Sequence, residues 1–375
     1  MKNILISGGA GFIGSQLCIK LIEKGYVVTV LDNLSEQIHG VGESALYKSI
    51  KDKCIFIKGD VRHKQDWLKS IKGQDAVIHL AAETGTGQSM YEVEQYNEVN
   101  IMGTAHLLDI LANKTHSIKK LIIASSRAIY GEGKYHCSNH GVQYPNERKE
   151  QDMDNGEFNL KCATCNTELS LLATDEQAKI HPSSIYGINK QQQEQMVMLM
   201  GASLGIPAVA FRYQNVYGPG QSLSNPYTGI LSIFSTRILN GNNIDIYEDG
   251  QESRDFVYID DVVDATILGL ENNAANGEVF NIGSAEPTTV LTVAETLKKL
   301  FNAATTINVS GNYRVGDIRH NYADVTKAKK LLCFAPKYNF QQGITAFVAW
   351  VKTQKVEEDK YEQSKQELQA KGLMK

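Results

Sequence analysis

A tyrosine and a lysine four residues apart, Tyr186 and Lys190, are the first candidates for chemistry in this sequence. A helix is expected near 184–204, and residues at this spacing project from one face of a helix. A lysine ammonium beside a phenol favours the phenolate, which would bring a pKa of about 10 toward the working pH. The pair could then remove the proton of an alcohol, with the Ser126 hydroxyl bonded to the same oxygen.

The run "SGGAGFIGS" follows an apolar segment and opens a helical one. Gly9, Gly11 and Gly14 satisfy G-x-G-x-x-G, and Gly8 gives an overlapping G-x-x-G-x-x-G. Such glycines let backbone N–H groups approach a pyrophosphate at the start of a helix. Asp32 ends the next apolar run, where its carboxylate can accept hydrogen bonds from both ribose hydroxyls and repel a 2′-phosphate. The combination favours NAD over NADP as the ligand. It also favours a dinucleotide site over the alternative, a glycine turn that binds no ligand.

Two cysteine-containing pairs have the two-residue spacing of zinc ligands. They are Cys137 with His140, and Cys162 with Cys165. Three thiolates and one imidazole complete a tetrahedral set and leave no open position, which predicts a structural zinc. The alternatives are scattered loop cysteines without a metal, or His136 or His181 as the nitrogen ligand.

Short apolar runs alternate with helical patterns through the first half of the chain. Runs such as "NILIS", "VVTVLD" and "KKLIIASS" are continuous and rich in β-branched residues, which is typical of parallel strands buried on both faces. Segments between them, such as "GSQLCIKLIEKG", have apolar residues at helical spacing. The repeating unit is therefore βαβ, and the expected fold is an α/β, Rossmann-type, doubly wound parallel sheet.

The pattern changes along the chain indicate several parts. We expect the dinucleotide-binding sheet to occupy 1–213, with a polar, zinc-ribbon-like insertion at about 131–180. After the sheet domain, residues 214–353 are expected to form mainly a smaller C-terminal substrate-binding lobe. Its helices are expected near 228–240, 260–271 and 290–303. The charged tail, 354–375, is expected to be a solvated helix that frays into disorder.

Composition narrows the class of partner. The chain has 375 residues, 42% of them hydrophobic, with a formal net charge of -4 and a pI near 6.2. This charge gives no electrostatic case for binding nucleic acid or an anionic membrane. The chain has no apolar run of about 18 residues, and its N-terminus passes from an apolar run straight into glycines without a signal-peptide pattern. A cytoplasmic location is expected.

Motifs in a fixed order make the chain resemble the extended short-chain dehydrogenase/reductase family, and within it the NAD-dependent sugar-nucleotide epimerases and dehydratases. The motifs are "GGAGFIG", "DNL" at 32–34, "GDV" at 59–61, "HLAA" at 79–82, "NIMGT" at 100–104, "SSRAIYG" at 125–131, "YGINK" at 186–190, "RYQNVYGPGQ" at 212–221 and "RDFVYIDD" at 254–261.

The resemblance implies roles for individual residues. The catalytic residues would be Ser126, Tyr186 and Lys190. The residues expected beside NAD are Gly8, Gly11, Phe12, Ile13, Gly14, Asp32, Asn33, Asp60, Val61, Leu80, Ala81, Ala82, Asn100, Tyr186 and Lys190. The residues expected beside the substrate are Thr86, Gln88, Ser89, Arg127, Asn215, Arg254, Arg314 and Asp317. Among these, Asn215 and Arg254 would meet the pyrophosphate, since arginine is a bidentate partner for phosphate.

The resemblance also separates the reactions of this family. Its 4,6-dehydratases have an Asp-Glu pair after the catalytic hydroxyl residue, where this chain has Arg127 and Ala128. Relatives that epimerise through a carbanion have a cysteine at the position of Ala128, and the ketoreductases usually use NADPH, which Asp32 disfavours. The remaining chemistry is 4-epimerisation through a transient 4-keto sugar, with tightly held NAD regenerated in each cycle.

For the sugar, "AAETGTGQSMYE" and "SSRAIYGEGKYHC" resemble enzymes that convert dTDP-L-rhamnose to dTDP-6-deoxy-L-talose. A UDP-hexose 4-epimerase, another sugar-nucleotide dehydratase or reductase, and a non-catalytic NAD-sensing scaffold are the alternatives. The resemblance further implies a homodimer through helices near 91–113 and 184–204.

Overall fold

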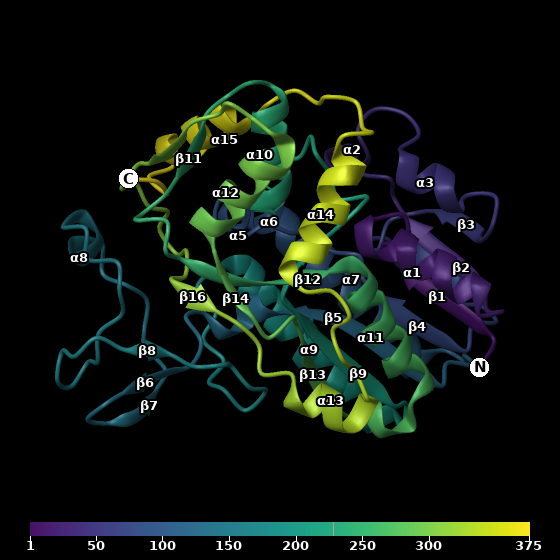
Figure 1. The fold of residues 1–375 in the computed structure, drawn as a ribbon. Helices are drawn as coiled ribbons and strands as arrows, with labels where there is room; N and C mark the ends of the chain where they lie inside the picture. Colours follow the sequence, from purple (N-terminus) through teal and green to yellow (C-terminus); the bar gives the residue numbers. More distant parts are fainter. Residues whose placement is uncertain (228) are drawn as a thin grey trace.

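A seven-stranded, fully parallel sheet forms the centre of the computed structural model, which describes residues 1–227 and 229–375 (Figure 1). Its strands are β1 (Asn3–Ser7), β2 (Val27–Asp32), β3 (Ile55–Lys58), β4 (Ala76–His79), β5 (Lys120–Ser126), β9 (Ala208–Tyr213) and β13 (Val279–Ile282). The strand order is β13-β9-β5-β4-β1-β2-β3. In register, Ile4 pairs with Val28 on one side and Ala76 on the other. The expected α/β architecture is confirmed.

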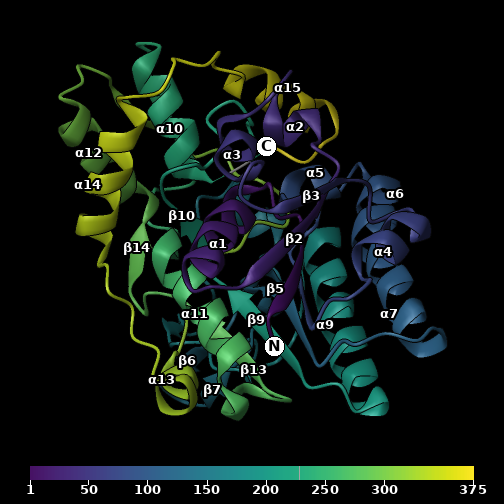
Figure 2. The ribbon, with the colours of Figure 1, turned by 90° about the vertical axis from the view of Figure 1, so that its right-hand side faces the viewer.

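Helices cover both faces of this sheet (Figure 2). On one face lie α1 (Phe12–Glu23) and α11 (Ile259–Glu271), and on the other lie α4 (Lys64–Ser70), α7 (Gly103–Asn113) and α9 (Ile185–Leu204). Successive strand residues point to opposite faces, so Ile4 and Leu5 join different hydrophobic cores. This two-sided burial explains why the strands are continuous apolar runs.

One expected helix is divided. The segment 97–113 consists of a π-helix, Asn97–Met102, followed by α7, and it is preceded by α6 (Val93–Tyr96). Within the π-helix, the Asn100 side chain donates to the Glu83 carbonyl oxygen at 3.1 Å and accepts from the Glu83 N–H at 2.9 Å. A π-turn in this position lets Asn100 hold the segment after β4.

The second half of the chain contributes smaller sheets and also one strand of the main sheet. The small sheets contain β10 (Asn215–Tyr217), β12 (Ser253–Tyr258), β14 (Pro287–Thr289) and β16 (His320–Asn321), and separately β11 (Ile244–Ile246) with β15 (Ile307–Val309). The helices are α10 (Ile230–Leu239), α12 (Val290–Phe301), α13 (Thr326–Leu332) and α14 (Phe340–Val351). The first residue of the helix expected at 228–240 lies outside the described residues. Because β13 joins β9, the lobe shares the central sheet, and the division near residue 213 stays a prediction.

The insertion projects to one side of the molecule (Figure 1), and its Arg148 side chain reaches the Asp317 carbonyl oxygen of the substrate lobe at 2.9 Å. It contains a three-stranded sheet of β7 (Gly141–Gln143), β6 (Tyr135–Cys137) and β8 (Ser170–Leu171), and the short helix α8 (Glu150–Asp154). Its buried side chains, Tyr135, Leu160 and Leu169 among them, form a separate small core. The remaining short helices of the chain are α2 (Glu36–His39), α3 (Ala45–Ile50), α5 (Thr86–Ser89), and 3-10 turns at Arg127–Tyr130 and Asn273–Ala275.

The C-terminal tail differs from the expectation of a frayed, solvated helix. Helix α15 (Tyr361–Ala370) is followed by main-chain pairing of Lys375 with Tyr313. Tyr361, Ser364 and Leu368 are buried, at spacings that place them on one face of α15. The tail is therefore docked by that face. Among the described residues, no helix combines the length and apolar character needed to cross a membrane.

Candidate active site

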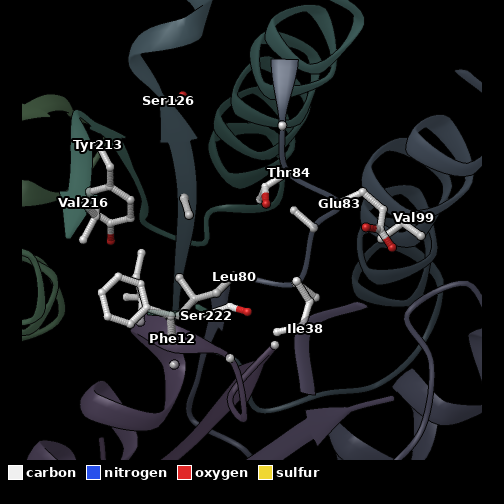
Figure 3. Close-up of a pocket in the computed structure, with 18 of the residues that line it drawn as sticks. Phe12, Ile38, Leu80, Glu83, Thr84, Val99, Ser126, Tyr213, Val216 and Ser222 are labelled. Carbon is white, nitrogen blue, oxygen red and sulfur yellow. The ribbon is translucent and has the colours of Figure 1, made fainter. Parts of the chain in front are cut away.

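A cavity of about 460 Å³ opens at the carboxyl ends of the central strands, the edge where ligands bind in open α/β sheets. Figure 3 shows side chains from separate segments around it, with Phe12 and Leu80 at one end and Ser126 and Tyr213 at the other. Most residues predicted to meet NAD lie on its wall: Gly8, Gly11, Phe12, Ile13, Gly14, Asp32, Asn33, Val61, Leu80, Ala81, Ala82, Tyr186 and Lys190.

The glycine turn between β1 and α1 requires glycine at two points. A Cβ on Gly14 would lie 2.3 Å from the Gly8 carbonyl oxygen, and Gly8 itself has φ +71°. Gly11 is the N-cap of α1 and supplies no side-chain acceptor to its first turn. The helix therefore presents backbone N–H groups to the cavity, which suits the pyrophosphate of a dinucleotide.

Asp32 is held in place beside this turn. Its two carboxylate oxygens accept hydrogen bonds from the backbone amides of Ala10 and Leu34, each at 2.9 Å. The His39 Nε2 atom lies 3.6 Å from this carboxylate. A fixed carboxylate at the end of β2 is the group that recognises ribose hydroxyls.

Asp60 lies at the end of β3 but is not on the cavity wall, whereas the adjacent Val61 is. Burial opposes ionisation of Asp60, but hydrogen bonds from Arg62 and Asn33 outweigh it and lower the pKa of Asp60 to about 2. The Arg62 guanidinium is thus paired with Asp60 at 2.9 Å.

The start of α9 positions the candidate base. Ser184 caps the helix by accepting from the Gly187 amide at 3.1 Å, and the Ser89 hydroxyl accepts from the Tyr186 amide at 3.1 Å. One turn later, the Lys190 ammonium donates to the Ala124 carbonyl oxygen at 3.0 Å. Lys190 Nζ lies 5.9 Å from the centre of the Tyr186 ring, so both side chains share one helix face as expected.

The expected direction of the Tyr186 pKa is wrong for this pocket. Burial raises the pKa of Tyr186, and the hydrogen bond with Ser126 and the charge of Arg127 offset this only in part. Burial also lowers the pKa of Lys190 to about 7. For Tyr186, desolvation therefore outweighs the Ser126 hydrogen bond and the charge of Arg127, and for Lys190 it disfavours the ammonium form.

Ser126 ends β5, where its hydroxyl accepts from the Ala128 amide at 3.1 Å and begins a 3-10 turn. The turn directs Arg127 across to Asn215, whose side-chain oxygen accepts from Arg127 Nε at 3.0 Å. Burial and the nearby charge of Arg254 lower the pKa of Arg127 to about 10. Ser126, Arg127 and Asn215 all line the cavity.

Next to the cavity, Asp317 lies among several arginines. It accepts from Arg254 at 3.0 Å and from Arg314 at 2.8 Å. Burial opposes its ionisation, but Arg314, Arg254, Arg127 and Arg148 hold the pKa of Asp317 well below its usual range. A guanidinium such as that of Arg254 or Arg314 is a bidentate partner for phosphate, which suits a diphosphate at this cluster.

Some predicted residues have a different place. Gln88, Ser89 and Asn100 are buried, and each makes hydrogen bonds within the protein. Like these three, Arg254, Arg314 and Asp317 do not line the described cavity, whereas Thr86 does. Gln88 exchanges hydrogen bonds with Gln37, and its side-chain oxygen accepts from Tyr96. These side chains support the site from behind its wall.

Other wall residues were missed from the sequence. Tyr213, Gln214, Gln221 and Tyr227 line the cavity. The first three fall inside the motif "RYQNVYGPGQ", which could have suggested them, whereas no sequence signal marks Tyr227. Arg148, from the insertion, was also missed, although its side chain reaches the Asp317 carbonyl oxygen at 2.9 Å.

The four predicted metal ligands lie together in the insertion. Their ligand atoms are all within 4.8 Å of one another. Cys137 Sγ is 3.6 Å from both His140 Nδ1 and Cys165 Sγ, and Cys162 Sγ is 3.6 Å from His140 Nδ1. Bond lengths of about 2.3 Å to sulfur and about 2.0 Å to nitrogen in a tetrahedral zinc site put ligand atoms roughly 3.5 to 3.8 Å apart. The donor set and its spacing fit zinc. Among the described residues, neither His136 nor His181 belongs to the group.

Comparisons with known proteins agree with this site. The model of the NAD dependent epimerase/dehydratase family matches residues 4–150 and 166–283. A dTDP-L-rhamnose 4-epimerase of Burkholderia thailandensis is 34% identical, over 93% of this chain and 95% of that protein. The structure of a UDP-glucose 4-epimerase from Thermotoga maritima, with UDP-glucose, is 31% identical and has a TM-score of 0.74, covering 93% of this chain and 98% of that one.

A further solved structure bears on the cofactor. The UDP-glucuronic acid 4-epimerase of Bacillus cereus, in complex with UDP-glucuronic acid and NAD, is 27% identical with a TM-score of 0.76. The match covers 93% of this chain and 99% of that one.

Proposed function

The chain belongs to the NAD-dependent epimerase/dehydratase family, and from this premise we propose that it inverts C4 of dTDP-L-rhamnose to give dTDP-6-deoxy-L-talose. Together, the relatives support the more general activity of an NAD-dependent sugar-nucleotide epimerase. The observation that carries the reaction type is the Tyr186 and Lys190 pair on one wall of a cavity whose other end is the glycine turn with Asp32.

Bound NAD would supply a reversible hydride acceptor at this site. The glycine turn and Asp32 would hold it, on the fit of backbone donors and carboxylate described above. Tyr186 takes the proton of the sugar 4-hydroxyl and later returns it, with Ser126 hydrogen-bonded to the same oxygen. Since burial raises the pKa of Tyr186, its anion needs neighbouring positive charge, which Arg127 provides, and a hydrogen bond, which Ser126 provides.

The diphosphate of the substrate is assigned to Arg254 and Arg314, and its nucleoside ribose to Asp317. This leaves the sugar between that cluster and Tyr186, near Thr86 and Arg127. Inversion requires the keto sugar to turn between hydride removal and return, so a substrate held mainly by its diphosphate suits the reaction.

The 34% identity to a dTDP-L-rhamnose 4-epimerase supports the choice of sugar. The principal alternative is a UDP-hexose, because a UDP-glucose 4-epimerase structure is 31% identical. Incubation of the purified protein with dTDP-L-rhamnose and, separately, with UDP-glucose, followed by NMR of the sugar, tests the choice. Inversion of UDP-glucose alone favours the alternative, and inversion of neither rejects both.

We further propose one structural zinc held by Cys137, His140, Cys162 and Cys165. Its closed ligand set gives it no part in bond making. The insertion is linked to the substrate lobe through Arg148, which bonds Asp317 and pairs with Glu248 at 2.8 Å, and through Asn159, which accepts from Arg319. Elemental analysis of protein purified without chelators should find about one zinc per chain, and less than about a tenth rejects the site.

The homodimer stays a prediction. The expected helices are α7 and α9, on the same face of the sheet, with Met102 before α7 49% exposed and Leu199 on α9 68% exposed. Sedimentation velocity of the wild type beside Leu199→Glu would measure the state directly.

A further inference from the structure

Helix α15 lies outside the residues that the family model matches, yet it packs against segments that form the active site. Arg237 of α10 pairs with Glu362 of α15 at 3.1 Å, and Leu368 of α15 lies near Gly87 of α5. Its buried face consists of Tyr361, Ser364 and Leu368, and the chain after it ends on the buried Met374. A segment with one buried face and two attachment points is a fixed part of the molecule.

One end of this segment holds the sugar side of the cavity. The Tyr227 hydroxyl donates to the Glu367 carboxylate and accepts from the Tyr91 hydroxyl at 3.0 Å. Tyr227 is on the cavity wall. Leu368 lies against α5, since a Cβ placed on Gly87 would be 3.5 Å from Leu368 Cδ2. Glu367 and Leu368 therefore fix Tyr227 and the helix that carries Thr86.

The other end holds the diphosphate side. The Tyr361 hydroxyl donates to the Tyr247 hydroxyl at 2.9 Å, and the Arg314 guanidinium lies 5.3 Å from the Tyr247 ring centre. Tyr361 is itself fixed, because the Arg237 guanidinium stacks on its ring at 4.1 Å. Arg314 is thus stacked on a tyrosine whose position depends on α15.

Main-chain pairing with the last residues of the chain also holds the diphosphate side. The Tyr313 amide donates to the Lys375 carbonyl oxygen at 2.9 Å, the Lys375 amide donates back at 3.0 Å, and the Val315 amide donates to the Leu373 carbonyl oxygen at 3.0 Å. These bonds flank Arg314 on both sides. The backbone that carries one predicted diphosphate ligand is therefore paired with the last residues of the chain.

We propose that the segment 359–375 supports the nucleotide-sugar site from outside its wall, with Glu367 positioning Tyr227 on the sugar side and Tyr361 positioning Arg314 on the diphosphate side. The ligand is a nucleoside-diphosphate sugar, so the inference rests on the proposed function. A single helix bonded at both sides fixes the distance between the two subsites. The segment should therefore affect substrate binding and selection more than the hydride chemistry, which takes place at Tyr186.

The test compares three point variants in the full-length, NAD-loaded protein: Glu367→Ala, Glu367→Gln and Tyr361→Phe. Gln369→Ala, on the exposed face of the same helix, is the matched control. Loss of one such hydrogen bond should raise KM about five- to tenfold for Glu367→Ala and weaken dTDP and UDP binding about fivefold for Tyr361→Phe. In both variants kcat and bound NAD should change less than about twofold. Glu367→Gln, which still offers an acceptor to Tyr227, should restore most of the loss.

The outcomes separate this inference from the proposed function. Nucleoside diphosphate binding is measured by calorimetry and needs no turnover. It therefore tests whether the segment 359–375 supports the substrate site even if no sugar is inverted. If the wild type inverts no sugar nucleotide, the proposed function fails while the calorimetry still decides on Tyr361. If Glu367→Ala and Tyr361→Phe match Gln369→Ala in KM and in dTDP and UDP affinity, the proposed role of the segment 359–375 is overturned. A fall in kcat at unchanged KM also overturns it.

Discussion

The hydroxyl of Ser89 accepts a hydrogen bond from the backbone amide of Tyr186 at 3.1 Å. This bond joins α5 to the first turn of α9, where the amides of a helix lack partners within the helix. Ser89 was expected to meet the sugar, but its side chain is fully buried and its hydroxyl also donates to the Thr86 carbonyl oxygen at 2.6 Å. It therefore ties the sugar-facing segment to the candidate base.

Replacement of Ser89 by alanine should displace Tyr186 slightly and leave its amide unbonded. We expect kcat to fall about tenfold, because small errors in the position of a reacting group are costly, and bound NAD to stay near the wild-type level. Thr289→Ala is the control, since Thr289 caps α12 by the same kind of bond at 3.1 Å, away from the cavity. Steady-state kinetics in which both variants keep full kcat would contradict this role.

The low pKa of Lys190 gives a signature in stability against pH. Lys190 is 3% exposed, and burial lowers its pKa to about 7, whereas an unfolded lysine titrates near about 10.4. Between these values the unfolded chain binds one more proton than the folded chain, so the lysine lowers stability near neutral pH, and the loss diminishes as pH rises.

The measurement compares wild type with Lys190→Met, both with the dinucleotide removed. The free energy of unfolding of the wild type minus that of the variant should increase by about 1.4 kcal/mol per pH unit from pH 7 to 9. Urea unfolding at pH 7, 8 and 9 measures the difference. A difference that stays constant over this range would show that Lys190 is charged in the folded protein throughout.

Removal of a zinc ligand should affect the insertion before it affects chemistry. Cys165→Ala should lose the metal and make 131–180 sensitive to limited proteolysis, because the insertion has only a small core of its own. Cys333→Ala is the matched control, since Cys333 is an exposed thiol outside the ligand group. Through Arg148 and Asp317, we expect KM to rise severalfold while kcat changes less than about threefold. Equal zinc contents in the two variants would reject the assignment.

Local patterns were sufficient for most of the central sheet and for the residues beside it. The glycine turn, Asp32 and the Tyr186 and Lys190 pair depend on spacing within one or two elements, so the sequence indicates them directly. The continuous apolar strands likewise follow from burial on both faces. Strand β13 was missed because "VFNI" is short and lies among loops.

Features that depend on distant contacts could not be predicted in the same way. The tail is rich in charge, and only Tyr361, Ser364 and Leu368 mark its buried face, so its docking depends on partners far away in sequence. The raised pKa of Tyr186 arises from burial by several segments, which residue spacing does not report. Arg148 reaches Asp317 only because the insertion folds back on the substrate lobe.

The central claim is tested most directly with dTDP-L-rhamnose that carries deuterium at C4, with C4-deuterated UDP-glucose as the alternative substrate, followed by NMR. The account predicts inversion at C4 with the deuterium retained in the product, because the hydride that leaves C4 is the one that returns. It also predicts that Tyr186→Phe abolishes inversion while bound NAD is kept. No inversion of either sugar, or inversion with loss of deuterium to solvent, would contradict it.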